Sequence, residues 1–529
     1  MSHTFIITSA AYVDSEQIAE FGLLPPAFLP LGNRRLFAHQ QEALKSHASR
    51  IVLTIPEHFT PDPVDADLLQ ALNIEVLPVP EGLSLGHSVI YAINVAACAH
   101  GPVSILHGDS LLTGLAYGTL DALSVSQSAP PPGYGWAWGR QTGEGIRLFK
   151  STHLPEAEDK ALTGFFAFSD GARLVQAIAR KNGDFIAGLA DYGETKPLAM
   201  LPCDHWFDFG HSSTYHLSRR RITTERDFNR LSSVGRSITK SGSKPEKLLA
   251  EALWFETLPP PLRVYTPSYL GKQGDRQDVS YSLEYLSLPT LSDLSVFGRL
   301  ELNSWKRIFS ACDEVLSALA EHPGPAESLD SAKGLYLGKT LQRLDQLAES
   351  CSLDLGAPCR LNGRPLPSLR EMAEIAAAQI PEPTRSTLIH GDFCFSNLLY
   401  DMRANIVRVI DPRGIDAQGG MSGFGDIRYD IAKLYHSAIG LYDQIVAGNM
   451  SLERHSSLDF SLDLPDTRSV RLIQDAFLNH QFAGLSIAAA HALPISVLLF
   501  LSMPPLHADD PKRQMALLAN GMRLFGLLT

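Results

Sequence analysis

The sequence predicts a two-domain chain, in which an α/β domain precedes a domain built from a small mixed lobe and a helical lobe. Three observations indicate this. The chain has 529 residues, more than the roughly 100–200 residues of one ordinary domain. Up to about residue 215, short apolar runs alternate with helix-like stretches, which is typical of a sheet with crossover helices. Beyond that point, a few strand-like runs give way to mostly helical sequence.

A polar, arginine-rich stretch at residues 216–230, HLSRRRITTERDFNR, marks the change between the two patterns. We therefore expect one domain at residues 1–222 and a second at 223–529. Within the second, the small lobe should span about 223–292 and the helical lobe about 293–529.

The composition is that of a globular protein, with 45% apolar and 19% charged residues. The 57 acidic and 45 basic residues give a formal charge of -12, which would repel a phosphate backbone, so we expect no nucleic-acid partner. The six cysteines form no CxxC pair, and the start MSHTFIITSA does not resemble a signal peptide. A cytoplasmic protein is expected, and a homo-oligomer is compatible with the sequence.

The most apolar stretch is AGLSIAAAHALPISVLLFL, from Ala483 to Leu501. His491 and Pro494 interrupt it. Because a polar ring and a proline break are easier to satisfy inside a protein than in lipid, we expect buried helices here and no membrane span.

In the first domain, the runs FIIT, IVLTI, IEVLPV and VSILHGD are predicted to be strands, with DADLLQALN and HSVIYAINVAACA as helices between them. The last of these runs places Asp109 at the end of a buried strand. In an open α/β sheet, ligands gather at the carboxyl ends of the strands, although a lone Asp there also serves as a cap or a turn residue.

Three further stretches accompany Asp109: LPPAFLPLGNRRLFAHQ, the turn EGLSLGHSV, and DHWFDFGHSSTY, which contains Asp208. In the turn, Gly86 would let the backbone approach a base or a phosphate. Together they resemble the sugar-nucleotide and phosphocholine nucleotidyltransferase family. The resemblance implies a Rossmann-like (GT-A-like) fold over about 215 residues. It also implies a magnesium site formed by Asp109 and Asp208, with CTP or another nucleoside triphosphate as the nucleotide.

The first domain departs from that family at two points. TSAAYVDSEQ stands where a glycine-rich loop with a basic residue is expected, and Pro26 stands where a lysine is expected. Arg34 or Arg35 would compensate unless both are surface arginines. Nucleotidyl transfer, nucleotide-sugar binding and glycosyl transfer therefore all stay open for this domain.

The second domain begins with a strand that ends at Lys240, a helix that contains Glu251, and a strand at YSLEYL. Farther on, Asp392 is followed by Asn397, two strand-like runs joined by the turn DMRAN, and then Asp411. A hairpin of this length folds back, so it would bring Asp411 near Asp392 and Asn397. Phosphoryl transfer needs such a cluster, with one carboxylate as the base and further oxygen ligands for magnesium.

The stretches HGDFCFSN, VIDPRG and GDIRYDIAKL resemble the aminoglycoside phosphotransferase and choline kinase family, which has a bilobal protein-kinase-like α+β fold. The resemblance implies an ATP- and Mg²⁺-dependent enzyme with Asp392 as catalytic base and with Asn397 and Asp411 as metal ligands. His390 should brace the loop. Arg413 would form a local salt bridge or meet a phosphate.

A kinase also needs a lysine on the nucleotide phosphates, held by a helix glutamate. Lys240 and Glu251 are the candidates, with Lys244 and Lys247 as competitors for the lysine. Gly235 is the one glycine of the expected phosphate cover. In SLEYLSLPTL, backbone groups from Glu284 to Leu286 should meet adenine.

The helix predicted after Asp411 should bury one face and begin at Asp426, whose carboxylate would cap it. By resemblance, Asp426 and Asp430 would be structural anchors. The apolar positions with helical spacing are Ile427, Ile431, Leu434, Tyr435, Ala438 and Ile439.

The two resemblances together imply a bifunctional enzyme similar to those of surface-polysaccharide (capsule or lipopolysaccharide) biosynthesis. The second domain would phosphorylate a small hydroxyl compound, which could be a sugar, a polyol or an amino alcohol, and the first would transfer a nucleotidyl group to a phosphorylated metabolite. The alternatives are an antibiotic-type phosphotransferase, a kinase fused to an inactive nucleotide-sugar-binding or glycosyltransferase-like domain, and a scaffold with two inactive sites.

Overall fold

The structure is a computed structural model that describes residues 3–131, 134–143, 145–151, 156–222, 229–234, 236–274, 278–416 and 419–528. The chain divides into two compact units, residues 1–222 and 223–529. The arginine-rich stretch expected to be a joint begins inside helix α7 (Ser212–Arg221). Residues 223–228 and Gly235 lie outside the described residues.

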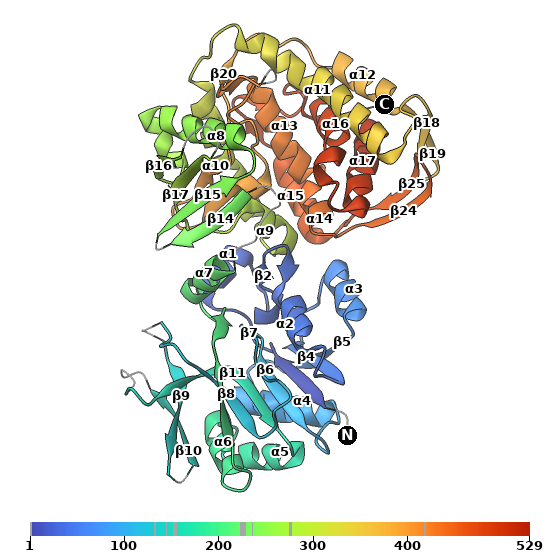
Figure 1. Cartoon of the computed structure of the whole chain (residues 1–529). Coiled ribbons are helices and arrows are strands. Elements are labelled where there is room, and N and C mark those ends of the chain that lie inside the picture. The colour runs from blue at the N-terminus through green and yellow to red at the C-terminus, as the bar shows by residue number, and fades with distance from the viewer. Residues whose placement is uncertain are drawn as a thin grey trace. The chain divides into compact units, whose positions relative to one another are not determined.

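The first unit is an α/β domain, as predicted, around a nine-stranded sheet (Figure 1). Its parallel centre has the order β6-β1-β4-β5, formed by Val103–His107, Thr4–Thr8, Arg50–Pro56 and Ile74–Val79. These strands are rich in Val, Ile and Leu because helices such as α4 (Leu85–Val95) pack against them and leave most of their side chains buried. The other strands of the sheet are β8 (Ala122–Ser126), β9 (Trp136–Thr142), β10 (Gly145–Ser151), β11 (Lys160–Phe168) and β12 (Ala199–Cys203).

A short antiparallel ribbon lies beside the carboxyl end of β6. Strand β7 (Ser110–Thr113) pairs with β13 (His205–Asp208), and Ser110 faces Asp208 in the register. The ribbon therefore brings a residue from the end of the unit next to the end of the central strand β6. The remaining helices are α1 (Ser15–Phe21), α2 (Leu36–Leu44), α3 (Pro63–Ala71), α5 (Gly171–Arg180) and α6 (Phe185–Gly193).

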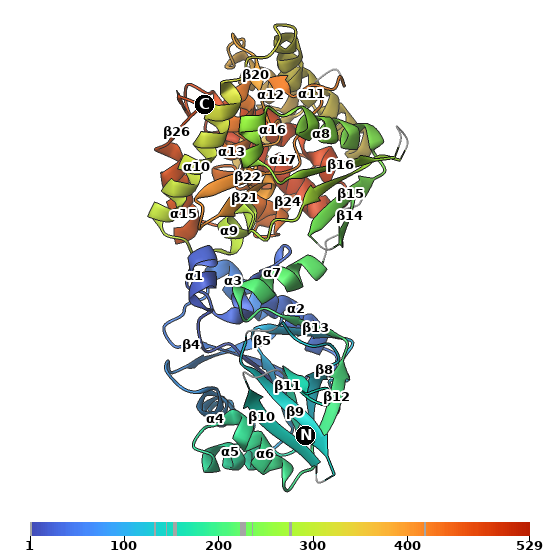
Figure 2. The ribbon, with the colours of Figure 1, turned by 90° about the vertical axis from the view of Figure 1, so that its left-hand side faces the viewer.

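The second unit has the two predicted lobes. The small lobe is an antiparallel sheet of order β14-β15-β17-β16 (Figure 2). Helix α8 (Pro245–Thr257) packs on it, and the Phe255 ring lies against Tyr269 and Tyr281 of the sheet. The four strands are Asn229–Val234, Ser237–Gly242, Ser280–Glu284 and Tyr269–Gln273.

The helical lobe is centred on helix α13 (Ile427–Ala438), the helix predicted after Asp411. Asp426 caps it, as predicted, by accepting a hydrogen bond from the backbone N–H of Arg428 at 3.0 Å. The prediction of one buried face is wrong, because every residue from 429 to 438 is buried. Helices pack around α13 on several sides: α10 (Leu302–Ala320), α14 (Tyr442–Val446), α15 (Arg468–Leu478) and α16 (Ala492–Ser502).

The lobe also contains a four-stranded sheet, β19-β18-β25-β24, which the mostly helical interpretation of this region missed. Its strands are Arg364–Ser368, Pro358–Leu361, Asp459–Asp463 and Ser451–Ser456. Helices α9 (Leu291–Phe297), α11 (Ser328–Cys351), α12 (Leu369–Ala378) and α17 (Pro511–Phe525) complete it.

The apolar segment 483–501 is only partly helical. Its start lies in a short hairpin of β26 (Gln481–Phe482) and β27 (Leu485–Ser486), and the rest belongs to the buried helix α16, with Pro494 in the first turn. Across the described ranges, no helix has both the length and the apolar character that crossing a membrane would need.

Candidate active sites

A tight loop in the second unit presents Asp392. The Asp430 carboxylate on α13 accepts hydrogen bonds from the backbone N–H groups of His390 at 2.7 Å and Gly391 at 2.8 Å. The His390 ring lies 3.0 Å from the Ile410 carbonyl oxygen, and burial lowers the pKa of His390 to about 4. These contacts confirm that His390 braces the loop, as a neutral ring.

A β hairpin follows this loop and confirms the predicted return of the chain. Strands β21 (Leu398–Asp401) and β22 (Ile406–Val409) pair in antiparallel register. The Ile410 N–H donates to the Asn397 carbonyl oxygen at 3.0 Å, so Asp411 follows directly beside Asn397. Asp411 has a φ of 57°, a left-handed conformation that is uncommon for Asp and that often occurs at functional sites.

The Asp392 carboxylate is held by Lys433 and Asn397. The Lys433 ammonium lies 2.8 Å from Asp392 Oδ1, and the Asn397 amide donates to Asp392 Oδ2 at 3.1 Å. Burial raises the pKa of the Asp392 carboxyl, but the buried Lys433 ammonium outweighs burial and brings that pKa well below its usual range. The sequence interpretation missed Lys433, although a lysine three residues after Asp430 within an apolar helix was an available signal.

A buried ion pair in the small lobe reaches Asp411. Lys240 Nζ on β15 lies 2.7 Å from Glu251 Oε2 on α8 and 3.0 Å from Asp411 Oδ1. The Tyr281 hydroxyl donates to the same Glu251 oxygen at 2.7 Å. Burial lowers the pKa of the Lys240 ammonium, but Asp411 and Glu251 together raise it above the ordinary value. Lys247, one of the competitors, lies 3.5 Å from Glu251 and is half-exposed.

Asp392, Asn397 and Asp411 line one cavity of about 250 Å³. Glu284 and Leu286 lie at and just after the end of β17 and do not line it. The Glu284 carboxylate accepts hydrogen bonds from Ser268, and the Glu284 backbone N–H donates to the Ser268 carbonyl oxygen, so the side chain of Glu284 is engaged locally.

The two further aspartates of α13 are engaged structurally. Asp426 lies 2.7 Å from Arg428 and accepts a hydrogen bond from the Tyr336 hydroxyl at 2.6 Å. Asp430 is fully buried beneath the loop, and burial raises its pKa to about 7. Arg413 has no carboxylate partner among the described residues; its guanidinium lies 3.4 Å from the Tyr429 hydroxyl oxygen.

In the first unit, Asp109 and Asp208 face one small space. A Cβ atom added at Gly210 would lie 2.8 Å from Asp109 Oδ2 and 3.6 Å from Asp208 Oδ1. Burial, and then the charge of Asp109, raise the pKa of Asp208 to about 7. Asp208 Oδ2 is buried and finds no hydrogen-bond partner in the described part of the chain. An oxygen in this position is available to a cation or a proton.

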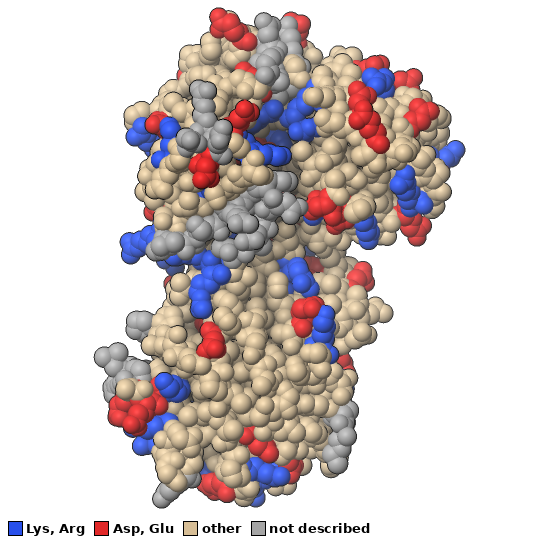
Figure 3. Space-filling model, in the orientation of Figure 1, with Lys and Arg blue, Asp and Glu red and all other residues tan. Residues whose placement is uncertain are grey.

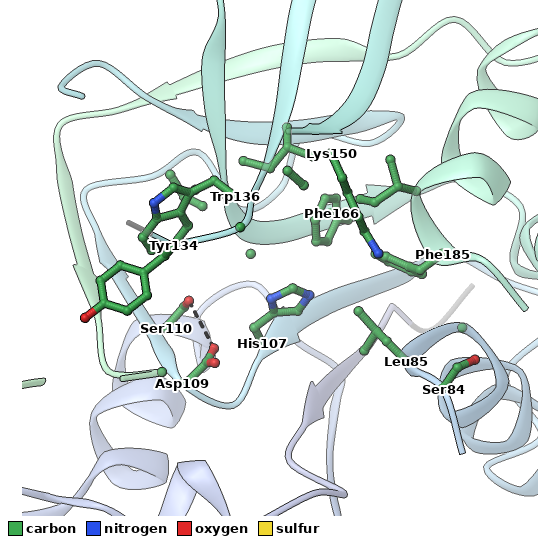
Figure 4. Close-up of a pocket in the computed structure, with 18 of the residues that line it drawn as sticks. Ser84, Leu85, His107, Asp109, Ser110, Tyr134, Trp136, Lys150, Phe166 and Phe185 are labelled. Carbon is green, nitrogen blue, oxygen red and sulfur yellow. Dashed lines mark hydrogen bonds between the residues drawn. The ribbon is translucent and has the colours of Figure 1, made fainter. Parts of the chain in front are cut away.

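Two cavities meet at Asp109. One, of about 590 Å³, has aromatic walls, and Lys150 points into it from β10 (Figure 4). The other, of about 480 Å³, is formed by residues 8–14 and Pro26. Of the described residues that line this second cavity, none is Lys or Arg.

Of the two arginines proposed to compensate, Arg35 differs from both predictions, and Arg34 is a surface arginine. Arg35 is neither a surface arginine nor a compensating cation, because it is buried and bidentate to Asp65 at 2.7 and 2.8 Å. Arg34 is exposed and lines neither cavity. Gly86 lines the aromatic cavity, but a Cβ there would lie 2.3 Å from the Gly183 carbonyl oxygen, so this glycine serves a close backbone approach within the protein.

No cluster of three or more His, Cys, Asp or Glu side chains suited to a metal ion occurs within the described ranges. Each candidate site instead offers two oxygen-bearing side chains, Asn397 with Asp411 and Asp109 with Asp208. A magnesium ion at such a site takes its remaining ligands from nucleotide phosphates and water.

Comparisons with known proteins match one family model to part of the second unit and solved structures to parts of the chain. Residues 246–449 match the family model described as the phosphotransferase enzyme family, so the second unit contains a domain of that family. No curated protein sequence matches the chain.

Three solved structures are similar to parts of the chain. An inositol-1-phosphate CTP transferase from T. maritima is 12% identical over 42% of this chain and 98% of its own, with a TM-score of 0.32. HddC from Yersinia pseudotuberculosis is 14% identical over 42% of this chain and 100% of its own, with a TM-score of 0.31. A thermostable mutant of aminoglycoside phosphotransferase APH(4)-Ia is 14% identical over 57% of this chain and 92% of its own, with a TM-score of 0.35.

Proposed function

We propose that the second unit transfers the γ-phosphoryl group of ATP to a hydroxyl group of a small molecule. The observation that carries this proposal is the convergence of Asp392, Asn397 and Asp411 on one cavity, with the Lys240–Glu251 ion pair in contact with Asp411. Phosphoryl transfer depends mainly on positioning and charge stabilisation, and these groups supply both.

In this mechanism Asp392 is the catalytic base. Its ion pair with Lys433 keeps it ionised, and the Asn397 amide fixes its orientation. As the acceptor oxygen bonds to the γ-phosphorus, the bond from that phosphorus to the leaving ADP oxygen breaks and the hydroxyl proton passes to Asp392. Lys433 also lines the cavity beside Asp392, so its ammonium group can neutralise negative charge on the transferred phosphoryl group.

Lys240 would bind the α and β phosphates, because Glu251 holds its ammonium group and is itself held by a hydrogen bond from the Tyr281 hydroxyl. Asn397 and Asp411 are oxygen ligands of the kind that Mg²⁺ prefers, and they would hold it against the phosphates. When bound, Mg²⁺ would offset the charge of the triphosphate. Backbone groups from Glu284 to Leu286 remain our proposal for the contact with adenine.

The test measures ADP release from ATP and Mg²⁺ with a panel of sugars, polyols, amino alcohols and aminoglycosides. Asp392→Asn should lower the rate by about 10²–10⁴-fold, the usual contribution of a positioned base. Asp401→Asn is the matched control, because Asp401 is on the same hairpin but outside the cavity. Acceptor-dependent ADP release that survives in the Asp392 variant would refute the assignment.

For the first unit, we infer a magnesium-dependent nucleotide site at Asp109 and Asp208. The support is the shared space of the two carboxylates and the partnerless buried oxygen of Asp208. Nucleotidyl transfer from CTP or another nucleoside triphosphate to a phosphorylated metabolite is the reaction we propose there. The cavity of residues 8–14 provides no lysine or arginine for a triphosphate among the described residues, which favours slow transfer.

Pyrophosphate release with CTP or UTP and the phosphorylated product of the second unit tests this inference. Loss of that release in Asp109→Asn supports nucleotidyl transfer. Nucleotide binding without pyrophosphate would leave the first unit as a nucleotide-sugar-binding or glycosyltransferase-like domain instead.

A kinase and a nucleotidyltransferase in one chain would act in sequence, because the phosphomonoester made by one is the substrate of the other. We propose a cytoplasmic role in surface-polysaccharide biosynthesis on this ground. An antibiotic-type phosphotransferase is the rival. It predicts that deleting residues 1–222 leaves a cell's drug resistance intact, whereas the biosynthetic role predicts that the same deletion abolishes the polysaccharide.

A further inference from the structure

The cavity at Asp392 is unusually basic. Figure 3 shows Lys and Arg side chains gathered around a hollow in the second unit. Among the described residues that line the cavity, the only carboxylates are Asp392 and Asp411, which already have roles in the proposed reaction. The cations that line it are Lys247, Lys339, Arg343, Arg413 and Lys433.

Among the described residues, two of these cations have carboxylate partners and three have none. Lys433 pairs with Asp392, and Lys247 pairs with Glu251. Within the described residues, no carboxylate forms an ion pair with Lys339, Arg343 or Arg413. Arg343 donates to the Ser502 carbonyl oxygen at 3.2 Å and Arg413 to the Tyr429 hydroxyl at 3.4 Å, and both of those oxygens are neutral.

The unpaired cations repel one another. Burial, followed by the charges of Arg413, Arg343 and Lys433, lowers the pKa of Lys339 to about 6. Burial likewise lowers the pKa of Arg343. Gathering like charges in a poorly solvated cavity costs free energy, and a bound anion removes that cost. A positively charged guest such as an aminoglycoside or choline would increase it.

Two cations of the cluster, Lys339 and Arg343, are associated with Asp392 rather than with the Lys240–Glu251 pair. Lys339 and Arg343 are one turn apart on α11, so they share a helix face. Lys339 interacts electrostatically with Asp392, whereas Lys240 interacts with Asp411 and Glu251. Lys240 itself does not line this cavity. Lys339 and Arg343 therefore act on the part of the cavity beside Asp392. The acceptor must lie there, because its hydroxyl has to reach the catalytic base.

We propose that the phosphate acceptor is an anionic hydroxyl compound, whose own phosphate or carboxylate group is bound by Lys339, Arg343 and Arg413 while its hydroxyl reaches Asp392. This rests on the proposed kinase function and narrows its substrate class. The bonds formed and broken are those given above: the acceptor oxygen bonds to the γ-phosphorus, ADP leaves, and Asp392 takes the proton. The anionic group only binds.

A panel of acceptors that differ in charge tests this directly. ADP formation by the full chain is measured with ATP, Mg²⁺ and one acceptor at a time. The first series runs from anionic to cationic through glucose 6-phosphate, gluconate, glucose, glucosamine and kanamycin. The second does the same with glycerol 3-phosphate, glycerate, glycerol and ethanolamine. Phosphate and carboxylate members should exceed their neutral counterparts by roughly 10- to 100-fold in kcat/KM for each charge-assisted contact. The phosphate and carboxylate arms then identify which anion the site takes. A neutral or cationic compound as the best acceptor would overturn this proposal and leave the kinase assignment intact.

Variants show which substrate the cluster serves. Arg343→Met should raise the KM of the anionic acceptor at least 10-fold and change the KM of ATP by less than 2-fold, and Arg343→Lys should recover part of the loss. Arg471→Met, an exposed arginine that lies outside the cavity, is the control for net charge. A rise in the KM of ATP alone would instead assign the cluster to the triphosphate and refute the proposal.

A binding measurement does not depend on catalysis. Inorganic phosphate is titrated calorimetrically into the ADP- and Mg²⁺-loaded protein, with circular dichroism to verify folding of each variant. Saturable binding that weakens at least 10-fold in Arg343→Met and persists in Arg471→Met supports the anion site, even if no acceptor in the panel is phosphorylated. Binding that is absent, or equal in all three proteins, contradicts it.

Discussion

The two candidate sites use carboxylates in opposite electrostatic settings. In the second unit, Asp392 faces Lys433 and Asp411 faces Lys240, so each carboxylate has an ammonium group within 3.0 Å. In the first unit, Asp109 and Asp208 face each other, and Asp208 has a pKa raised to about 7 by burial and by Asp109. In the second unit each carboxylate therefore already has a cation beside it, while the carboxylate pair of the first unit needs a cation or a proton to relieve its repulsion.

This difference separates the two proposed reactions. A site whose cations are built into the protein can bind a triphosphate and hold its base ionised at neutral pH. The cavity of residues 8–14 has no lysine or arginine among the described residues that line it, so a triphosphate there must obtain its positive charge from a metal ion or from outside that cavity.

Removing the central cation of the second unit should have the largest effect. Lys240→Met takes away the ammonium group held by Glu251 and Asp411, so kcat/KM for ATP should fall by about 10²–10³-fold, as for other single charge-stabilising groups. Steady-state ADP release measures this. Lys272→Met is the control, because Lys272 is on the same sheet but pairs with Glu256 at the surface. Equal activity of the two variants would contradict the role of Lys240.

Removing the partner of that cation should weaken the fold of the small lobe. Glu251 is fully buried, and Glu251→Ala leaves Lys240 buried with Asp411 as its remaining carboxylate. We expect a loss of about 3 kcal/mol, typical of a broken buried pair. Hydrogen exchange of the α8 amides measures it without contribution from the first unit. Glu256→Ala on the same helix removes an exposed pair and should cost less than about 1 kcal/mol. If the two variants lose similar free energies of unfolding, the Lys240–Glu251 pair is not what stabilises the small lobe.

The parts of this architecture that sequence could predict are local. The hairpin from Leu398 to Val409 is predictable because two strand-like runs flank the turn DMRAN. In the structure, the Asp401 carboxylate in that turn accepts hydrogen bonds from the Arg403 and Ala404 N–H groups. The spacing from Asp392 to Asn397 is likewise short enough to keep both on one loop. Residues this close in sequence stay close in any fold, so motif spacing suffices.

The parts that sequence could not predict depend on distant packing. Lys433, Lys339 and Arg343 come from two helices, and nothing in the helical period shows that both helices line the Asp392 cavity. The sheet formed by β18 and β25 was missed for the same reason, since it pairs Leu361 with Phe460. The burial of Arg35 was missed because its partner, Asp65, lies thirty residues away on helix α3.

In the first unit, pH should act through Asp208. Its folded pKa of about 7 is above the unfolded value of roughly 3.9, so the folded state holds more protons between these values and loses stability as pH rises from about 4 to 7. Asp208→Asn should therefore stabilise the unit at pH 8, by about 1–2 kcal/mol or a few degrees in Tm, and the gain should vanish near pH 4. Calorimetric scans at the two pH values measure this. A gain of equal size at both would exclude repulsion from Asp109 as its cause.

The smallest effect should come from adding a cation to the first unit. Pro26 lines the cavity of residues 8–14 and begins a short 3-10 helix, so Pro26→Lys introduces an ammonium group beside the space proposed for a triphosphate, with little demand on the backbone. One added charge-assisted contact at a solvated site should tighten CTP binding in the presence of Mg²⁺ by up to about 10-fold. Equilibrium dialysis with labelled CTP measures this. Leu23→Lys is the matched control, because Leu23 is exposed and lies outside both cavities. If the two variants bind CTP equally, the missing lysine does not limit this site, and the contrast between the units lies in the carboxylate pair alone.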